Sequence, residues 1–212
     1  KSTALATWLQ ARGRRTLWLQ IDSGDADPAT LATSLDALVA TAAGRREAWP
    51  AFGADDAADL PGWLRRRVRA HLRALPPPWT LVLDNAQELP ADALLQPALA
   101  QALSELPEGV QWVFASREPP PAAFAGALGR QQLALAEPGL LRFDAAETLA
   151  LTRLHGRPDV MAPALAVAQG WAGGMTLMLA GTPAAALAPE PAARERLFDY
   201  FAEEVLSRFD AD

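Results

Sequence analysis

Two short apolar runs, each closed by polar residues, constrain the fold more than any other feature of the sequence. Thr80–Leu83 is followed by Asp84, and Val110–Ala115 is followed by Ser116–Arg117. The unbroken run Thr80–Leu83 is typical of a strand buried on both faces, as in parallel sheets, and Val110–Ala115 is expected to be a second buried strand. A third β-rich run, Thr16–Ile21, also ends at an acidic residue. The sequence therefore predicts at least three strands.

Helical patterns fill the segments between these runs. In Leu60–Leu75 the apolar residues recur at the spacing of a helix with one buried face. Strands that alternate with helices predict an α/β fold whose mostly parallel sheet is covered by helices on both faces. The helices expected here run over 2–12, from Pro28, over 60–75 and from Pro90, and a last edge strand is expected at 132–135 or 140–141. A solvated basic face is expected for the arginines of 60–75, which are Arg65, Arg66, Arg67, Arg69 and Arg73.

The pattern changes to helices alone after Phe143. Asp144 is a suitable N-cap for the first of them, and a break at Gly173–Gly174 is expected before the apolar run that follows. Further helices are expected from Pro163 and over Arg194–Phe209, with a linker rich in Ala and Pro over 182–191. We therefore expect an α/β core over 1–142 and a small all-helical domain over 143–190.

The composition excludes several kinds of site. The 212 residues include no cysteine and two histidines at unrelated positions, so disulfides and thiolate chemistry are absent and a zinc site is not expected. A net charge of −6 argues against direct nucleic-acid binding by this segment, because neutralising phosphates needs a basic surface. No run reaches the ~18 apolar residues of a membrane span. We expect a cytoplasmic protein with no membrane partner, and a sequence that begins within a longer chain.

Polar groups from three separate stretches of the chain are expected to meet at one edge of the predicted sheet. Asp84 and Arg117 follow consecutive buried strands, and Lys1 with Ser2 begins the first helix. In an open parallel sheet, ligands bind at the carboxyl ends of the strands. A phosphate-binding loop needs such a set: a lysine for the β- and γ-phosphates, a hydroxyl for Mg²⁺ and an acid on a neighbouring strand. Each group alone also fits a structural role, as a helix start, a cap or a strand-end ion pair.

Five segments, in the same order along the chain, resemble conserved segments of one protein family. They are Asp25–Leu31 (DADPATL), Leu81–Glu88 (LVLDNAQE), Phe114–Pro120 (FASREPP), Gly170–Leu177 (GWAGGMTL) and Phe198–Leu206 (FDYFAEEVL). The family is that of MalT-like regulators, large bacterial signal-transducing ATPases of the STAND class that often end in a LuxR-type DNA-binding domain. The second and third segments resemble the family's Walker B strand and the sensor strand after it.

The resemblance implies a P-loop NTPase core that binds ATP or ADP with Mg²⁺ and is cut within its phosphate-binding loop. Lys1 would contact the β- and γ-phosphates, Ser2 would bind Mg²⁺, and Thr3 would lie near the α-phosphate. Asp84 would hold the metal, usually through water, and Arg117 would sense the γ-phosphate. Residues 191–212 would begin the linker or winged-helix region.

Two departures from the family's pattern bear on the chemistry. Asn85 stands where the family has a second acid, and an amide cannot accept a proton from an attacking water. Glu88 is the nearest carboxylate that could replace it. Ala172 stands where the family has a proline in the helical domain, which weakens the expected grip on the nucleotide on that side.

These observations predict a slowly hydrolysing nucleotide switch within a bacterial transcriptional regulator. ATP would favour an open, self-associating state and ADP a closed one, and a protein or small-molecule inducer would bind elsewhere in the longer chain. The alternative is a degenerate P-loop fold that serves as a protein-interaction module with little ATPase activity. A DNA-repair or transport ATPase on the same core is disfavoured by the helical-domain motifs.

Overall fold

The computed structural model describes residues 1–44, 49–89, 94–158 and 168–181. The chain divides into two compact units, Lys1–Ala134 and the residues from Leu135 onward. The domain limits expected from the sequence, after residues 142 and 190, stay predictions.

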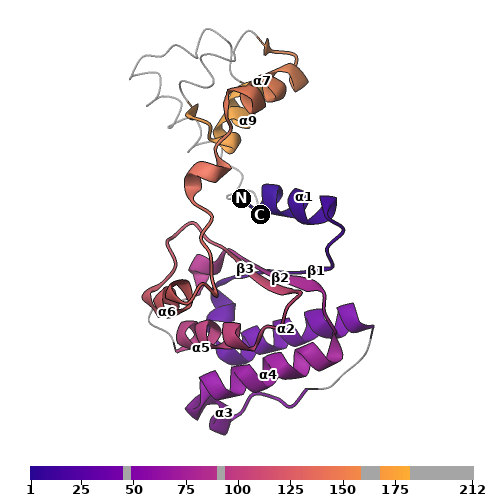
Figure 1. Cartoon of the computed structure of the whole chain (residues 1–212), viewed down its shortest axis with the longest axis vertical. Coiled ribbons are helices and arrows are strands. Elements are labelled where there is room, and N and C mark those ends of the chain that lie inside the picture. Colours follow the sequence, from indigo (N-terminus) through magenta and orange to yellow (C-terminus); the bar gives the residue numbers. More distant parts are fainter. Residues whose placement is uncertain (45–48, 90–93, 159–167, 182–212) are drawn as a thin grey trace. The chain divides into compact units, whose positions relative to one another are not determined.

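A parallel sheet forms the centre of the first unit (Figure 1). Its strands β1 (Thr16–Gln20), β2 (Trp79–Asp84) and β3 (Val110–Ala115) lie in the order β1-β2-β3, so β2 is central. Every residue of β2 is buried, as expected for a strand covered on both faces. The strands coincide with the three predicted runs to within a residue, and the α/β class with a parallel sheet is confirmed.

Helices flank this sheet on both sides. Figure 1 shows α2 (Pro28–Ala43), α4 (Leu60–Ala74) and α5 (Leu95–Ala102) on one side and α1 (Ser2–Ala11) on the other. The unit also contains the short helices α3 (Ala54–Ala58) and α6 (Ala125–Gly129) and the 3₁₀ turns η1 (Ser23–Ala26), η2 (Ala86–Glu88), η3 (Leu103–Glu105) and η4 (Ala122–Phe124).

The ends of α2 show why the helix forms where the sequence predicts it. The carboxylate of Asp27 accepts hydrogen bonds from the backbone N–H and the hydroxyl of Thr30, both at 2.9 Å. These bonds, the backbone one first, lower the pKa of Asp27. Pro28 occupies the first turn, where its missing N–H costs nothing, and Gly44 ends the helix in the left-handed conformation with φ +64°.

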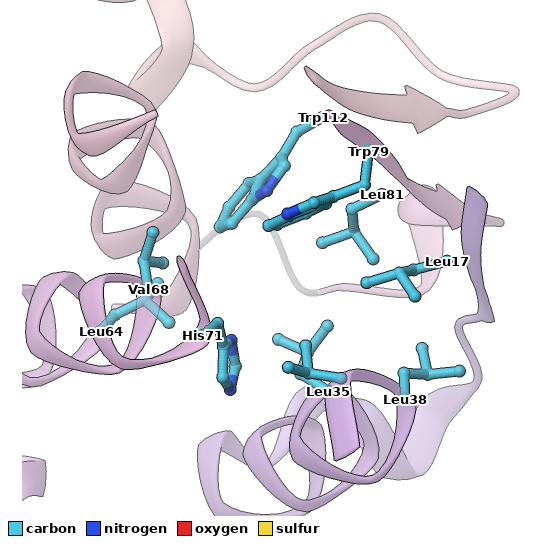
Figure 2. A pocket seen from close by; sticks show the side chains of 10 residues that line it. Leu17, Leu35, Leu38, Leu64, Val68, His71, Trp79, Leu81 and Trp112 are labelled. Atoms are coloured by element: carbon cyan, nitrogen blue, oxygen red, sulfur yellow. The ribbon is translucent and has the colours of Figure 1, made fainter. Parts of the chain in front are cut away.

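Apolar side chains on one face of the sheet pack against α2 and α4 (Figure 2). Leu17 and Leu81 are neighbours across β1 and β2, and they line a small cavity together with Leu35 and Val68. Trp112 lines the same cavity, and its indole N–H is buried without a partner among the described residues. The cavity belongs to the core, because nearly all of its lining side chains are apolar. None of the predicted site residues lines it.

A cluster of charged side chains is also buried between α2 and α4. Asp36 of α2 lies 3.3 Å from Arg67 Nη1 and 2.6 Å from His71 Nε2, through its two carboxylate oxygens. Arg67 and His71 are one turn apart on α4, so both can reach one carboxylate. Arg67 Nη2 also donates to the backbone oxygen of Pro50 at 2.6 Å. Arg67 therefore does not belong to the solvated basic face expected for this helix, because it is 6% exposed.

In the second unit, α7 (Ala145–Leu154) contacts α9 (Ala172–Gly181). The carboxylate of Asp144 accepts from the backbone N–H of Glu147 at 2.8 Å, and the Glu147 carboxylate accepts from the N–H of Asp144 at 3.0 Å. This reciprocal pair is a capping box, and it confirms the predicted N-cap.

Two expectations near this unit are wrong. Residues 132–135 and 140–141, which the structure describes, form no strand. Pro138–Leu141 is instead the 3₁₀ turn η5, because Pro138 lacks the N–H that a sheet needs and the apolar pair after it is too short to form a strand. Gly173–Gly174 does not break the chain, since both residues lie within α9. A Cβ on Gly174 would overlap the ring of Trp171, so the glycines let this indole lie against the helix.

Other expectations lie outside the described residues: the helix start at Pro90, the helices from Pro163 and over Arg194–Phe209, and the linker over 182–191. Within the described ranges, no helix is both long enough and apolar enough to span a bilayer.

Candidate functional site

The carboxyl ends of β2 and β3 meet the first turn of α1. Asp84 ends β2, lies in register with Ala115 at the end of β3, and is 5% exposed. α1 begins at Ser2 and has Lys1 at its N-cap position. Parallel strands end at the same edge of a sheet, and the residue that starts α1 comes to this edge as well. The structure thus brings Lys1, Ser2 and Asp84 together.

Ser2 is joined directly to Asp84. Its hydroxyl donates to Asp84 Oδ1 at 2.9 Å, and the backbone N–H of Asn85 donates to the same oxygen at 3.1 Å. Two donors on one oxygen hold the carboxylate in a single orientation. The other oxygen, Oδ2, has no hydrogen-bond partner among the residues that the structure describes. The carboxylate is therefore fixed at one oxygen and able to take a further ligand at the other.

Lys1 is held at the end of the neighbouring strand. Its Nζ donates a hydrogen bond to the backbone oxygen of Ser116, the residue that follows β3. The side chain is exposed, and the ammonium can exchange this carbonyl for another acceptor without burying a charge. With the bond between Ser2 and Asp84, this contact ties the start of α1 to the ends of both β2 and β3.

Asn85 turns the chain at the end of β2. It has φ +59° and ψ +39°, the left-handed conformation that asparagine tolerates better than most residues. The 3₁₀ turn η2 follows at once, closed by a hydrogen bond of 2.9 Å from the N–H of Glu88 to the oxygen of Asn85. The Asn85 side chain makes no hydrogen bond within the described part of the chain, so its amide is available to a ligand at this edge.

Arg117 follows β3 by two residues, and its side chain is exposed. Its guanidinium has no ion pair or hydrogen bond among the described residues, so it is not paired with the adjacent Glu118. The N–H of Glu118 instead donates to the hydroxyl of Ser116 at 3.0 Å. A strand-end ion pair, one of the structural roles open to Arg117 in the sequence, is absent here.

The donor set at this edge fits Mg²⁺ with a phosphate better than a metal held by protein alone. Among the described residues, no group of three or more His, Cys, Asp or Glu side chains could hold a metal ion. Mg²⁺ does not need such a group, because it takes one or two protein oxygens and completes its shell with water and phosphate. The Ser2 hydroxyl and the Asp84 carboxylate are such oxygens. The positive end of α1 and the ammonium of Lys1 favour an anion beside them.

The positions of the remaining predicted residues give little information about the site. The side chain of Thr3 is exposed, and only its backbone oxygen takes part in a hydrogen bond, from Thr7. Glu88 is exposed, and its carboxylate accepts from the amide of Gln87 at 3.4 Å. Ala172 is the first residue of α9, in the second unit. These positions neither add to the site nor exclude it.

One residue of the site was missed by sequence reasoning. Gln87, half-buried on η2, accepts a hydrogen bond at its Oε1 from the backbone N–H of Arg117 at 3.1 Å. The only signal in the sequence was its position three residues after a buried strand. That position became informative once the left-handed turn at Asn85 was known, since this turn directs Gln87 to the end of β3.

Comparison with known proteins identifies no family for this chain. The sequence matches no protein-family model, and a search of curated proteins found no significant relative. The class that the fold defines is therefore an α/β domain with a three-stranded parallel sheet and flanking helices.

Proposed function

We propose that this chain is the nucleotide-binding part of an ATP-dependent switch, a P-loop NTPase domain of the STAND type similar to MalT-like regulators. The observation that carries the proposal is the hydrogen bond of 2.9 Å between the Ser2 hydroxyl and the Asp84 carboxylate. In P-loop NTPases the same two residue types hold Mg²⁺ beside the nucleotide's phosphates. The placement of Lys1 at the end of β3 supports the same reading.

Each residue has a distinct part in the proposed site. Lys1 exchanges the oxygen of Ser116 for the β- and γ-phosphates, and Thr3 lies near the α-phosphate. Ser2 and Asp84 hold Mg²⁺, Asp84 through its second oxygen or a bound water. Arg117 pairs with the γ-phosphate, for which its unpaired guanidinium is suited. ATP and ADP then differ in one contact, which is what a nucleotide switch requires.

Hydrolysis in this proposal is slow. Asn85 can hold or orient a water by hydrogen bonding, but it cannot take the proton from that water as a carboxylate does. Slow turnover suits a switch, because the ATP-bound state persists long enough to act. In this proposal the ATP state self-associates, and an inducer sets the balance between ATP and ADP states. A cytoplasmic location follows from that role.

A protein-interaction module with little ATPase activity is the second candidate. It is favoured by Asn85, because a fold retained for binding alone has no need of a second acid. The two candidates differ in whether Asp84 binds Mg²⁺, and that difference is measurable.

The test compares nucleotide binding by the full-length protein and three variants, with and without Mg²⁺. Lys1→Ala should abolish binding of ATP and ADP. Asp84→Asn keeps an oxygen for Ser2 and for the N–H of Asn85 but removes the charge that binds the metal, so it should remove the Mg²⁺ dependence. Arg15→Ala is the matched control, because it removes an exposed charge that has no hydrogen bond or ion pair with a described residue.

The nucleotide switch and the protein-interaction module predict opposite results for nucleotide binding. If Lys1→Ala and Arg15→Ala bind nucleotide equally well, the proposed phosphate contact is wrong. If the wild-type protein binds neither nucleotide, the interaction module is the better account. Thermal unfolding of Asp84→Asn, expected to match that of the wild type, shows whether any loss of binding is due to misfolding.

A further inference from the structure

Gln87 joins the two loops that carry the proposed site. It lies on η2, directly after Asp84 and Asn85, and its Oε1 accepts from the backbone N–H of Arg117 at 3.1 Å. Among the described residues, this is the hydrogen bond that links the loop after β2 to the loop after β3. Gln87 therefore fixes the backbone position from which the side chain of Arg117 extends.

The orientation of the Gln87 amide is set by two partners. Oε1 faces the N–H of Arg117, and Nε2 donates to Glu88 Oε1 at 3.4 Å. An amide turned by 180° would set a donor against the Arg117 N–H and an acceptor against a carboxylate. The contacts therefore assign Oε1 to Arg117.

We propose that Gln87 is a positioning residue for Arg117, and that it couples the metal-binding loop to the residue that distinguishes ATP from ADP. This inference rests on the proposed function. A movement of Asp84 on binding Mg²⁺ is transmitted through Asn85 and η2 to the backbone of Arg117, and from there to the guanidinium.

A purely structural role for this bond is disfavoured, because each loop is closed without it. η2 is closed by the bond from the N–H of Glu88 to the oxygen of Asn85, and the loop after β3 by the bond from the N–H of Glu118 to Ser116 Oγ. Arg117 is exposed, so its N–H can turn to water when the bond is lost. Removing the Gln87 amide should therefore leave the fold intact.

The test uses the full-length protein with Mg²⁺ and measures the dissociation constants of ATP and ADP separately. Gln87→Met keeps the length of the side chain but has no amide oxygen. It is compared with Arg117→Ala, with the double variant, and with Gln101→Met, which alters an exposed glutamine of α5 whose side chain makes no hydrogen bond to any described residue. Hydrogen exchange of the Arg117 amide, followed by NMR without nucleotide, reports on the bond itself.

We expect Gln87→Met to weaken ATP binding by about threefold to tenfold, the effect of one hydrogen bond, and to leave ADP binding unchanged. The variant should have no further effect in the Arg117→Ala background, because Gln87 acts through Arg117. Exchange of the Arg117 amide should accelerate in Gln87→Met and not in Gln101→Met.

The inference and the proposed function fail in different ways. If Arg117→Ala weakens ATP selectively and Gln87→Met does not, or if the effect of Gln87→Met persists without Arg117, the positioning role is overturned and the switch stands. Unchanged exchange at Arg117 also overturns it. If the wild-type protein binds neither nucleotide, or binds both equally in all variants, the proposed function falls and the inference with it.

Discussion

Asp36→Asn should lower the free energy of unfolding far more than a substitution that breaks ion pairs on the surface. Asp36 neutralises Arg67 and accepts from His71, and both partners are nearly enclosed, with side chains 5% and 7% exposed. Asparagine keeps the size of the side chain and one oxygen, but it has no charge to set against the guanidinium. The variant therefore leaves Arg67 buried without its counter-ion.

The magnitude follows from the geometry. Removing one partner of a buried ion pair costs about 3–5 kcal/mol, because the other charge is left uncompensated. The side chain of Asp36 is 18% exposed, and Arg67 keeps its hydrogen bond to the oxygen of Pro50, so the lower end of this range applies. A loss of about 3 kcal/mol is large against the ~5–15 kcal/mol of a typical domain. It corresponds to a fall in melting temperature of about 6–12 °C for a chain of this size.

Urea unfolding followed by tryptophan fluorescence measures this loss. Trp63 lies 5.2 Å from the guanidinium of Arg67, and the ring of Trp49 meets that of His71 edge-on, also at 5.2 Å. Two of the seven tryptophans therefore contribute a signal from beside the cluster, and the total signal follows the unfolding of the whole domain. The midpoint should fall with an unchanged slope, since a change of slope would indicate an altered unfolded state.

The control is Arg66→Ala, which breaks two ion pairs on the surface of the same helix. Arg66 lies 3.5 Å from both Asp56 and Asp59, and its side chain is 59% exposed. Exposed pairs contribute at most about 1 kcal/mol, so this variant should unfold nearly as the wild type does. If Asp36→Asn costs no more than Arg66→Ala, water screens the cluster and the reasoning from burial is refuted.

Two other predictions concern turnover and acid stability. Asn85→Asp supplies the missing acid and should raise the rate of phosphate release by up to about 10²–10⁴-fold, the usual contribution of a positioned general base; an unchanged rate would show that the barrier lies elsewhere. The lowered pKa of Asp27, due first to the N–H of Thr30, contributes stability that is present above its unfolded pKa of about 3.9 and lost as the pH falls through the folded value. Between pH 5 and pH 2 the free energy of unfolding should thus fall more steeply in the wild type than in Asp27→Asn, whose cap does not titrate; equal slopes would contradict this.

The sheet was predictable because each strand carries its own signal. β2 and β3 are short runs dominated by apolar and β-favouring residues, bounded by polar, glycine or proline residues and too short for a typical helix. The failures have different causes. Gly173–Gly174 looked like a break because glycine pairs often end helices, and the sequence does not show that the ring of Trp171, three residues before Gly174, takes the space of a Cβ there. Arg67 looked solvated because its partner, Asp36, lies on another helix.

The site was predictable to the extent that topology alone determines it. Parallel strands end at one edge, so Asp84 and the residues after β3 had to be neighbours, and Ser2 reaches them through the first helix. Gln87 was not predictable, because its contact with Arg117 depends on the left-handed backbone of one residue, Asn85. Propensity permits such a conformation at asparagine but does not require it.

Asp36 and Asp84 are both held by several partners, and the difference between their partners indicates where a ligand site can be sought in this fold. Asp36 has a partner on each oxygen, and both partners, the Arg67 guanidinium that it neutralises and the His71 ring, are enclosed beside it, so the cluster serves stability. Asp84 is more deeply buried, yet only Oδ1 has partners, and both are neutral donors. A buried carboxylate is costly unless it is paired or fully hydrogen-bonded, and Asp84 has no ion pair among the described residues. The equally buried Asp25 accepts a hydrogen bond on each oxygen, whereas Asp84 accepts on one oxygen alone. The unpartnered oxygen of Asp84, and the guanidinium of Arg117 without a partner among the described residues, are the two features on which the proposed magnesium-nucleotide site depends.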